Sequence, residues 1–158
     1  MKPGKRFEEK FRESAEACGM VVRIPDKVGF ANGRTFSEES EADFFVFTVD
    51  GSFLVECKAV NRGYLQFYNV KEHQEKTLLE FDSVNESTHG ILAVEFYDKE
   101  GYRKPKRMFL LPIDTWLLYK ETSGRSSMTV DAFSRLGVEC PYVGSKYLID
   151  FGAWSRCV

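Results

Sequence analysis

The segment that decides the fold is DFFVFTVDGSFLVECKAV, residues 43–60. Both halves are rich in Phe and Val, which favour β-strands. Between them stands Asp50-Gly51, a dipeptide typical of tight hairpin turns. The pattern therefore predicts a β-hairpin with one strand over residues 43–49 and the other over residues 52–60.

Alternation along the second strand sorts its side chains between two faces. Val55, Cys57 and Ala59 share one face and are expected to pack into the core. Glu56 and Lys58 share the other face, so a carboxylate and an ammonium group project to the same side. Glu-x-Lys on its own is common, and a surface hairpin with both groups in solvent is the alternative interpretation.

Asp43 stands at the start of the partner strand. Pairing around the turn brings the two ends of the hairpin together, so Asp43, Glu56 and Lys58 are expected to converge. Two carboxylates can hold Mg²⁺, which prefers oxygen ligands and keeps several waters. Such a metal polarises a phosphate and lowers the pKa of a bound water, and a nearby lysine can stabilise charge developing on phosphorus. The set indicates phosphodiester hydrolysis.

Two further aspartates compete for the role of the first acid. Pro25-Asp26 lies 30 residues before Glu56 and has no hairpin to bring it there, so Asp43 is preferred. Asp50 lies in the turn, at the wrong end of the hairpin, where it is expected to serve turn formation.

The composition is that of a soluble globular protein of one domain, with 158 residues, 43% hydrophobic and 29% charged. A net charge of −2 lacks the basic excess of many nucleic-acid-binding proteins, although local basic stripes remain compatible with it. The four cysteines lack zinc-ligand spacing, and no signal peptide or long apolar run is present. A cytoplasmic location with reduced thiols is expected.

The rest of the chain predicts helices and strands in a mixed α/β order. Residues 25–40 are polar and are interpreted as a loop or a small excursion from the core. Asn69 is a candidate N-cap, and Gly19 a candidate helix-ending glycine. Helices are expected over 7–18, 70–81, 112–120 and 130–136, and strands over 20–24, 64–68, 90–97, 107–111 and 147–151, with a basic turn containing Gly101 and Pro105.

These residues resemble a known family. Asp43 followed by Glu56-Cys57-Lys58 resembles the D…(D/E)-x-K signature of the PD-(D/E)XK nucleases, although Ala42 stands where that signature has Pro. Gly4 followed by Glu8, and the run Glu72-His73-Gln74, resemble the first helix and the post-active-site helix of Holliday-junction resolvases, archaeal and RecU-type. The resemblance covers roughly residues 4–120. RecU-type proteins carry a longer stalk-like insertion, for which residues 25–40 are the corresponding segment.

The resemblance implies an α/β, restriction-endonuclease-like core, in which helices flank a central mixed β-sheet, within a single domain over 1–158 whose residues 121–158 are unassigned. It implies a structure-selective endonuclease that cuts four-way DNA junctions in recombination and repair and acts as a homodimer. The implied cofactor is Mg²⁺, for which Mn²⁺ can substitute. Another PD-(D/E)XK DNA nuclease, or a catalytically inactive DNA-binding relative, is the alternative.

The resemblance also implies roles for individual residues. The catalytic set comprises Asp43, Glu56, Lys58, Glu8 and Gln74, and the metal ligands are Asp43, Glu56, Glu8 and the backbone carbonyl of Cys57. Spacing alone does not separate Glu8 from Glu9, and Gln74 alone would be read as a surface amide. The basic residues expected to contact backbone phosphates are Lys2, Lys5, Arg6, Arg34 and Arg62.

Overall fold

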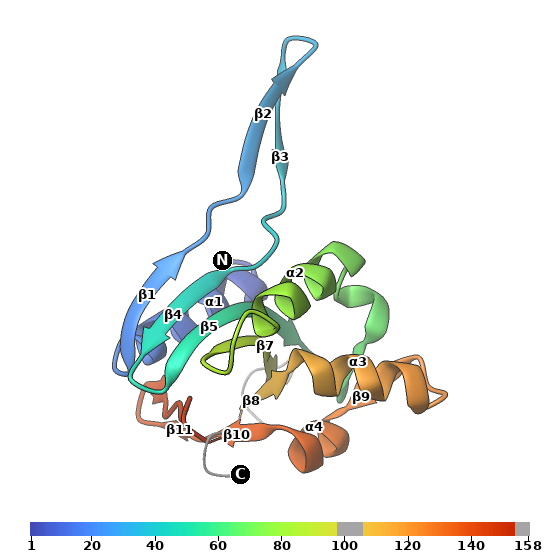
Figure 1. The fold of residues 1–158 in the computed structure, drawn as a ribbon. Helices are drawn as coiled ribbons and strands as arrows, with labels where there is room; N and C mark the ends of the chain where they lie inside the picture. The colour runs from blue at the N-terminus through green and yellow to red at the C-terminus, as the bar shows by residue number, and fades with distance from the viewer. Residues whose placement is uncertain (98–105, 154–158) are drawn as a thin grey trace.

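A six-stranded mixed sheet forms the centre of the computed structural model, which describes residues 1–97 and 106–153 (Figure 1). Strands β5 and β7 run parallel, and the other neighbouring pairs are antiparallel. The predicted α/β class with a central mixed sheet is confirmed. In spatial order the strands are β1 (Gly19–Arg23), β4 (Phe44–Thr48), β5 (Gly51–Val60), β7 (Thr88–Phe96), β8 (Arg107–Pro112) and β10 (Val138–Cys140).

The predicted hairpin is the pair β4–β5. Its register runs from Thr48 opposite Gly51 to Phe44 opposite Val55. Gly51 has a φ of 136°, and a Cβ there would lie 2.6 Å from the carbonyl oxygen of Ser87. The turn therefore needs glycine both for its backbone conformation and for the close approach of the loop before β7.

Helix α1 (Pro3–Ala15) covers one face of the sheet. Its buried side chains Phe7, Phe11 and Ala15 recur every three to four residues, as an amphipathic helix requires. They pack on Val55 and Cys57 of β5, and the C-terminal part of the chain adds Cys140, Tyr147 and Phe151 to the same core. Small strands β11 (Tyr142–Val143) and β12 (Lys146–Tyr147) lie in that C-terminal part.

The other face of the sheet is covered by three helices, α2 (Glu72–Asp82), α3 (Ile113–Thr122) and α4 (Val130–Leu136). Leu78, Trp116 and Phe133 are their fully buried anchors. A two-stranded ribbon of β6 (Tyr64–Gln66) and β9 (Ser127–Thr129), followed after β6 by the 3₁₀ turn η1 (Phe67–Asn69), extends this layer. With α1 behind the sheet, the fold has three layers.

Strands β2 (Lys27–Ala31) and β3 (Arg34–Glu38) form a hairpin that projects away from the sheet (Figure 1). Of the two alternatives for residues 25–40, the loop is therefore wrong, and the small excursion from the core is an ordered hairpin. The reason lies in Asn32-Gly33, whose φ values of 54° and 74° fit the turn type preferred by two-residue hairpins. We call this hairpin the arm.

Element ends differ from the prediction at several points. Gly19 begins β1 instead of ending α1, because a Cβ there would lie 2.0 Å from the carbonyl oxygen of Phe47. Helix α2 begins at Glu72 with Lys71 as its N-cap, so the proposed cap at Asn69 is wrong. Of the strand expected over 147–151, only Tyr147 lies in a strand. The basic turn with Gly101 and Pro105 lies outside the described residues.

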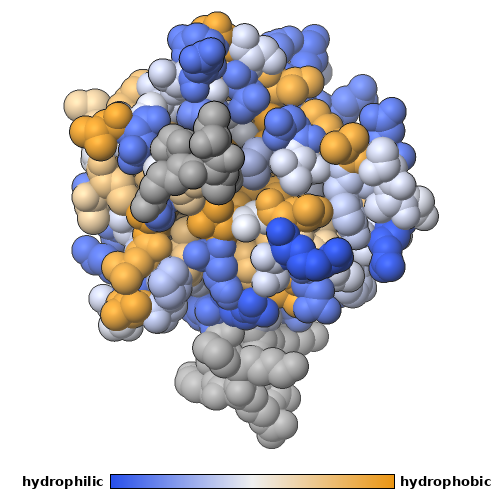
Figure 2. Space-filling view, turned by 60° about the horizontal axis from the view of Figure 1, so that its bottom comes forward, coloured by the Kyte–Doolittle hydropathy of each residue, from blue (hydrophilic) through white to orange (hydrophobic). Residues whose placement is uncertain are grey.

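Within residues 1–97 and 106–153, no helix is both long and apolar enough to cross a bilayer. On the face turned forward in Figure 2, apolar residues lie in small groups interleaved with charged ones.

The close contact between α2 and β7 predicts that adding one methyl group at Gly90 lowers the stability of the fold. A Cβ at Gly90 would lie 2.1 Å from the carbonyl oxygen of Leu78 on α2. We expect Gly90→Ala to lower the free energy of unfolding by about 1–3 kcal/mol, as overpacking does. Denaturant unfolding measures this. Gly63→Ala, which meets nothing within 4 Å, is the matched control and should change stability by less than about 0.5 kcal/mol.

Candidate active site

A pocket of about 560 Å³ opens where α1 begins, β1 ends and β4 and β5 meet. Its lining also includes Gln74 from α2 and residues 24–26 and 39–40 at the base of the arm. Five acidic side chains line it: Glu8, Asp26, Glu39, Asp43 and Glu56. We call this the acid pocket.

Asp43 lies one residue before β4, where the backbone ladder to β5 ends. Its backbone N–H donates to the carbonyl of Val55 at 2.9 Å, and its carboxylate Oδ2 accepts the N–H of Cys57 at 2.7 Å. The side chain thus takes the place of the next ladder acceptor. This bond holds the carboxylate beside β5 at the level of Glu56.

Glu56 is only 4% exposed, although it is an acid in a strand. Its Oε1 accepts a hydrogen bond from Gln74 Nε2 at 3.1 Å and pairs with Lys58 Nζ at 3.1 Å. The prediction that Glu56 and Lys58 share a face is confirmed.

Gln74 is 2% exposed, so it is not a surface amide. Its Oε1 accepts the backbone N–H of Lys71 at the start of α2, at 3.1 Å, while its Nε2 donates to Glu56. The helix N-terminus therefore fixes the amide, and the amide fixes the Glu56 carboxylate.

The pKa of both carboxyls is raised. Burial, opposed by the Cys57 N–H and reinforced by the charge of Glu8, raises the pKa of Asp43 to about 6. Burial and the charge of Asp43, opposed by Lys58, raise the pKa of Glu56 to about 8. Negative charge is therefore costly in this pocket unless a further cation enters it.

Other buried carboxylates are compensated by their own donors. Glu75 accepts from Trp116 Nε1 at 2.7 Å and from Lys120 Nζ at 2.9 Å. Glu95 accepts from the hydroxyl of Tyr147 at 2.5 Å. Neither carboxyl has a second acid among these partners. This contrast singles out the acid pocket as the candidate for chemistry.

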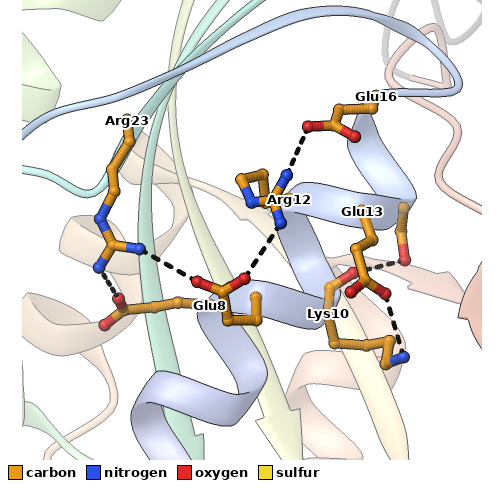
Figure 3. Close-up of polar contacts among 8 residues, drawn as sticks. Glu8, Lys10, Arg12, Glu13, Glu16 and Arg23 are labelled. Carbon is orange, nitrogen blue, oxygen red and sulfur yellow. Dashed lines mark hydrogen bonds and ion pairs between the residues drawn. The ribbon is translucent and has the colours of Figure 1, made fainter.

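Of the two glutamates that spacing left open on α1, only Glu8 lines the acid pocket. Its Oε2 lies 2.7 Å from a guanidinium nitrogen of Arg23 and 3.7 Å from Lys5 Nζ. Glu9 pairs with Arg12 at 3.1 Å and with Arg23 at 3.5 Å. Figure 3 shows the guanidinium of Arg23 turned towards the acidic side chains of α1. Arg23 thus bridges from β1 to α1.

Arg23 was missed by the sequence analysis. It ends β1 opposite Phe44, the residue after Asp43, and it lines the acid pocket. A basic residue at the end of a predicted strand is too common to be singled out. Its place at the acid pocket becomes evident only from the pairing of β1 with β4.

The remaining predicted residues lie around the acid pocket or away from it. Lys5 and Cys57 line it, as does Asp26, whose carboxylate accepts the Ser40 N–H at 3.0 Å and so joins the two ends of the arm. Arg34 begins β3, beside the turn of the arm. Outside the acid-pocket lining, Arg62 follows β5, and the guanidinium of Arg6 lies 6.0 Å from the ring centroid of Tyr97.

The donor set fits a hard cation that keeps water ligands. Among the described residues, no group of three or more His, Cys, Asp or Glu side chains is placed to hold a metal without other ligands. Asp43 and Glu56 nevertheless each have one carboxylate oxygen without a hydrogen bond to any of residues 1–97 and 106–153. Since no fully buried side-chain oxygen there lacks a partner, these two oxygens open into the pocket.

No family model and no curated protein matches the sequence. A solved structure, that of the Holliday junction resolvase Hjc from the archaeal hyperthermophile Archaeoglobus fulgidus, is similar at a TM-score of 0.55. The chain shares the fold of Hjc. The likeness covers 86% of this chain and 95% of Hjc, at 16% identity. The predicted restriction-endonuclease-like fold, a mixed sheet flanked by helices, is thereby confirmed.

The raised carboxyl pKa values predict how stability depends on pH when divalent ions are chelated. Between about pH 4.5 and pH 8 the folded chain keeps a proton on Glu56 that the unfolded chain has released, so stability falls as the pH rises. We expect Glu56→Gln to flatten this fall and to raise the melting temperature at pH 8 by a few degrees.

Thermal unfolding across this pH range is the measurement, and Glu121→Gln, an exposed acid on α3, is the matched control. Parallel pH profiles for wild type and Glu56→Gln would contradict the assignment.

Proposed function

We propose that this chain is a metal-dependent DNA endonuclease that cuts branched DNA, a Holliday-junction resolvase. The observation that carries the proposal is the convergence of Asp43, Glu56 and Lys58 in one acid pocket. The shared fold with Hjc, a Holliday junction resolvase by its description, supports the choice of substrate.

The proposed cofactor is Mg²⁺, with Mn²⁺ able to replace it. The open oxygens of Asp43 and Glu56 would be its protein ligands, with the backbone carbonyl of Cys57 and waters completing the shell and Glu8 as an additional ligand. When bound, the metal lowers the pKa of a water and polarises the phosphate.

The chain's own residues would position the substrate and stabilise charge. Lys58 Nζ, next to Glu56 and 20% exposed in its side chain, can reach a phosphate oxygen or a water in the pocket. Gln74 is a positioning residue that acts through Glu56. Arg23 and Lys5, on the other side of the pocket, supply positive charge for the phosphate backbone.

DNA contacts outside the pocket are proposed for Arg6, Arg62 and Arg34. Lys5 lines the acid pocket, Arg6 and Arg62 lie beside Tyr97 and Tyr64, and Arg34 lies on the arm. Contacts to phosphates give affinity that depends on salt and not on base sequence, which suits an enzyme that recognises a DNA branch by its shape.

A homodimer is part of the proposal, because two symmetric incisions need two active sites. Met20, Val22, Phe45 and Phe47 form an apolar edge patch on β1 and β4, in which Met20 lies opposite Phe47 and Val22 opposite Phe45. Met20, Val22 and Phe47 are 66%, 42% and 43% exposed. β1 is also the outermost strand of the sheet as described. We propose that a second copy covers this patch.

The catalytic proposal predicts that Asp43→Asn and Glu56→Gln each reduce cleavage of a four-way junction at least about a thousandfold, because either change removes a charged metal ligand. Binding of the junction should stay within a few-fold. Gel assays with Mg²⁺, with Mn²⁺ and with a chelator measure both. Glu121→Gln should cleave like wild type.

Substrate choice is tested in the same assay by a linear duplex of matched sequence. Faster cleavage of the junction supports a resolvase, and equal cleavage indicates a different nuclease of this fold. Undiminished cleavage by either active-site variant would remove the metal-site assignment.

The edge patch predicts that Phe47→Asp shifts the protein from dimer to monomer in sedimentation equilibrium, because a charge would be buried without a partner. Val49→Asp, at a fully exposed residue beside the hairpin turn, is the control and should leave the dimer intact. A Phe47→Asp protein that remains folded and dimeric would place the interface elsewhere.

A further inference from the structure

A second polar pocket lies beyond the acid pocket along β5. It has a volume of about 290 Å³ and is lined by Ala59, Val60, Asn61, Arg62, Tyr64, Gln66, Tyr68, Asn69 and Tyr97. Ala59 lines both pockets, so the two adjoin each other. We call this one the tyrosine pocket.

The local sequence explains why the tyrosine rings point outward. In the run Tyr64-Leu65-Gln66-Phe67-Tyr68, Leu65 and Phe67 are buried in the core beneath α3 and α4, at 0% and 7% exposure. Alternation along β6 leaves Tyr64 and Gln66 on the outer side, and Tyr68 follows them in η1. Tyr68 is 73% exposed, and its hydroxyl donates a hydrogen bond to Oε1 of Gln66.

The chemistry of the tyrosine pocket differs from that of the acid pocket. Its nine described lining residues include three tyrosines, three amides and one arginine, and none is acidic. Arg62 lies 6.0 Å from the ring centroid of Tyr64 and donates to its hydroxyl at 3.3 Å. Arg6 approaches the ring of Tyr97 from α1 at 6.0 Å.

Flat aromatic faces, amide groups and guanidinium groups in the absence of carboxylates are the features that bind a nucleobase attached to a phosphate chain. The volume is near the lower end of the roughly 300–1,000 Å³ of small-molecule pockets, so it suits a single ring system. A base that remains paired and stacked in a duplex does not offer its faces, whereas an unpaired base at a branch does.

We propose that the tyrosine pocket binds one unpaired nucleobase of a branched DNA while a nearby phosphate of the same strand occupies the acid pocket. Tyr64 and Tyr68 provide the stacking faces, and Arg62 and Gln66 provide hydrogen-bond donors to the base edge or its phosphate. This inference rests on the proposed function and deepens it by naming the part of the substrate that the second pocket recognises.

The spacing of the two pockets agrees with such a substrate. Arg62 lies four positions after Lys58, a span of at most about 13 Å in an extended chain. Stacked nucleotides advance about 3.4 Å along one strand of DNA. The bound base would therefore lie within about four nucleotides of the phosphate to be cut.

The experiment is a binding cycle that does not depend on cleavage. A four-way junction carrying one unpaired nucleotide at the branch is compared with the same junction in which that nucleotide lacks its base, both in chelator. Wild-type protein should bind the base-containing junction about tenfold more tightly. Tyr68→Ala should abolish the preference, and Tyr68→Phe, which keeps the ring, should retain it.

Tyr142→Ala, at an exposed tyrosine on β11, is the matched control and should keep the preference. Equal binding of both junctions by wild type, or a preference that survives in Tyr68→Ala and in Tyr64→Ala, overturns the proposal. Cleavage is scored separately. Base preference without cleavage would contradict only the proposed catalytic activity, and cleavage without base preference would contradict only the base pocket.

Discussion

The buried carboxyl of Glu56 and the half-buried carboxyl of Asp43 share a pocket that disfavours the negative charge of each, and the surrounding structure has to hold them there. The N–H of Cys57 holds the first, and Lys58 and Gln74 hold the second. These contacts require β4 to begin one residue after Asp43, in register with β5, and the N-terminus of α2 to pack against the same strand. The positions of β4, β5 and α2 therefore fix the geometry of the two carboxyls.

Strand β5 is the element that the sites have in common. Its inner half is buried on both faces between α1 and the α2–α4 layer, so it cannot shift without disturbing both cores. Beyond Glu56 and Lys58, the same strand leads through Ala59 to the tyrosine pocket. Strand β5 thus carries Glu56 and Lys58 in the acid pocket and leads on to the aromatic rings of the tyrosine pocket. This arrangement suits a chain that would cut one phosphate and hold a nearby base.

Part of this could be predicted from local patterns. The turn at Asp50-Gly51 and the flanking Phe and Val residues are strong hairpin signals, and the alternation of Val55, Glu56, Cys57 and Lys58 assigns their faces. The arm could have been found too, because Asn32-Gly33 is an equally strong turn signal. It was missed because its strands are only five residues long and mostly polar, so the alternation of Val28 and Phe30 in β2 is too short to stand out and β3 has Phe36 alone.

The sequence by itself determined the α/β class, the β4–β5 hairpin and the common face of Glu56 and Lys58, since these depend on contacts between residues close in the chain. Only the tertiary structure decided that Glu8 and not Glu9 lines the acid pocket and that Gln74 is buried against Glu56. It also decided that Arg23 belongs to the site. Those placements depend on how α1, α2 and β1 pack on the sheet, and packing between distant segments leaves no periodic mark in the sequence.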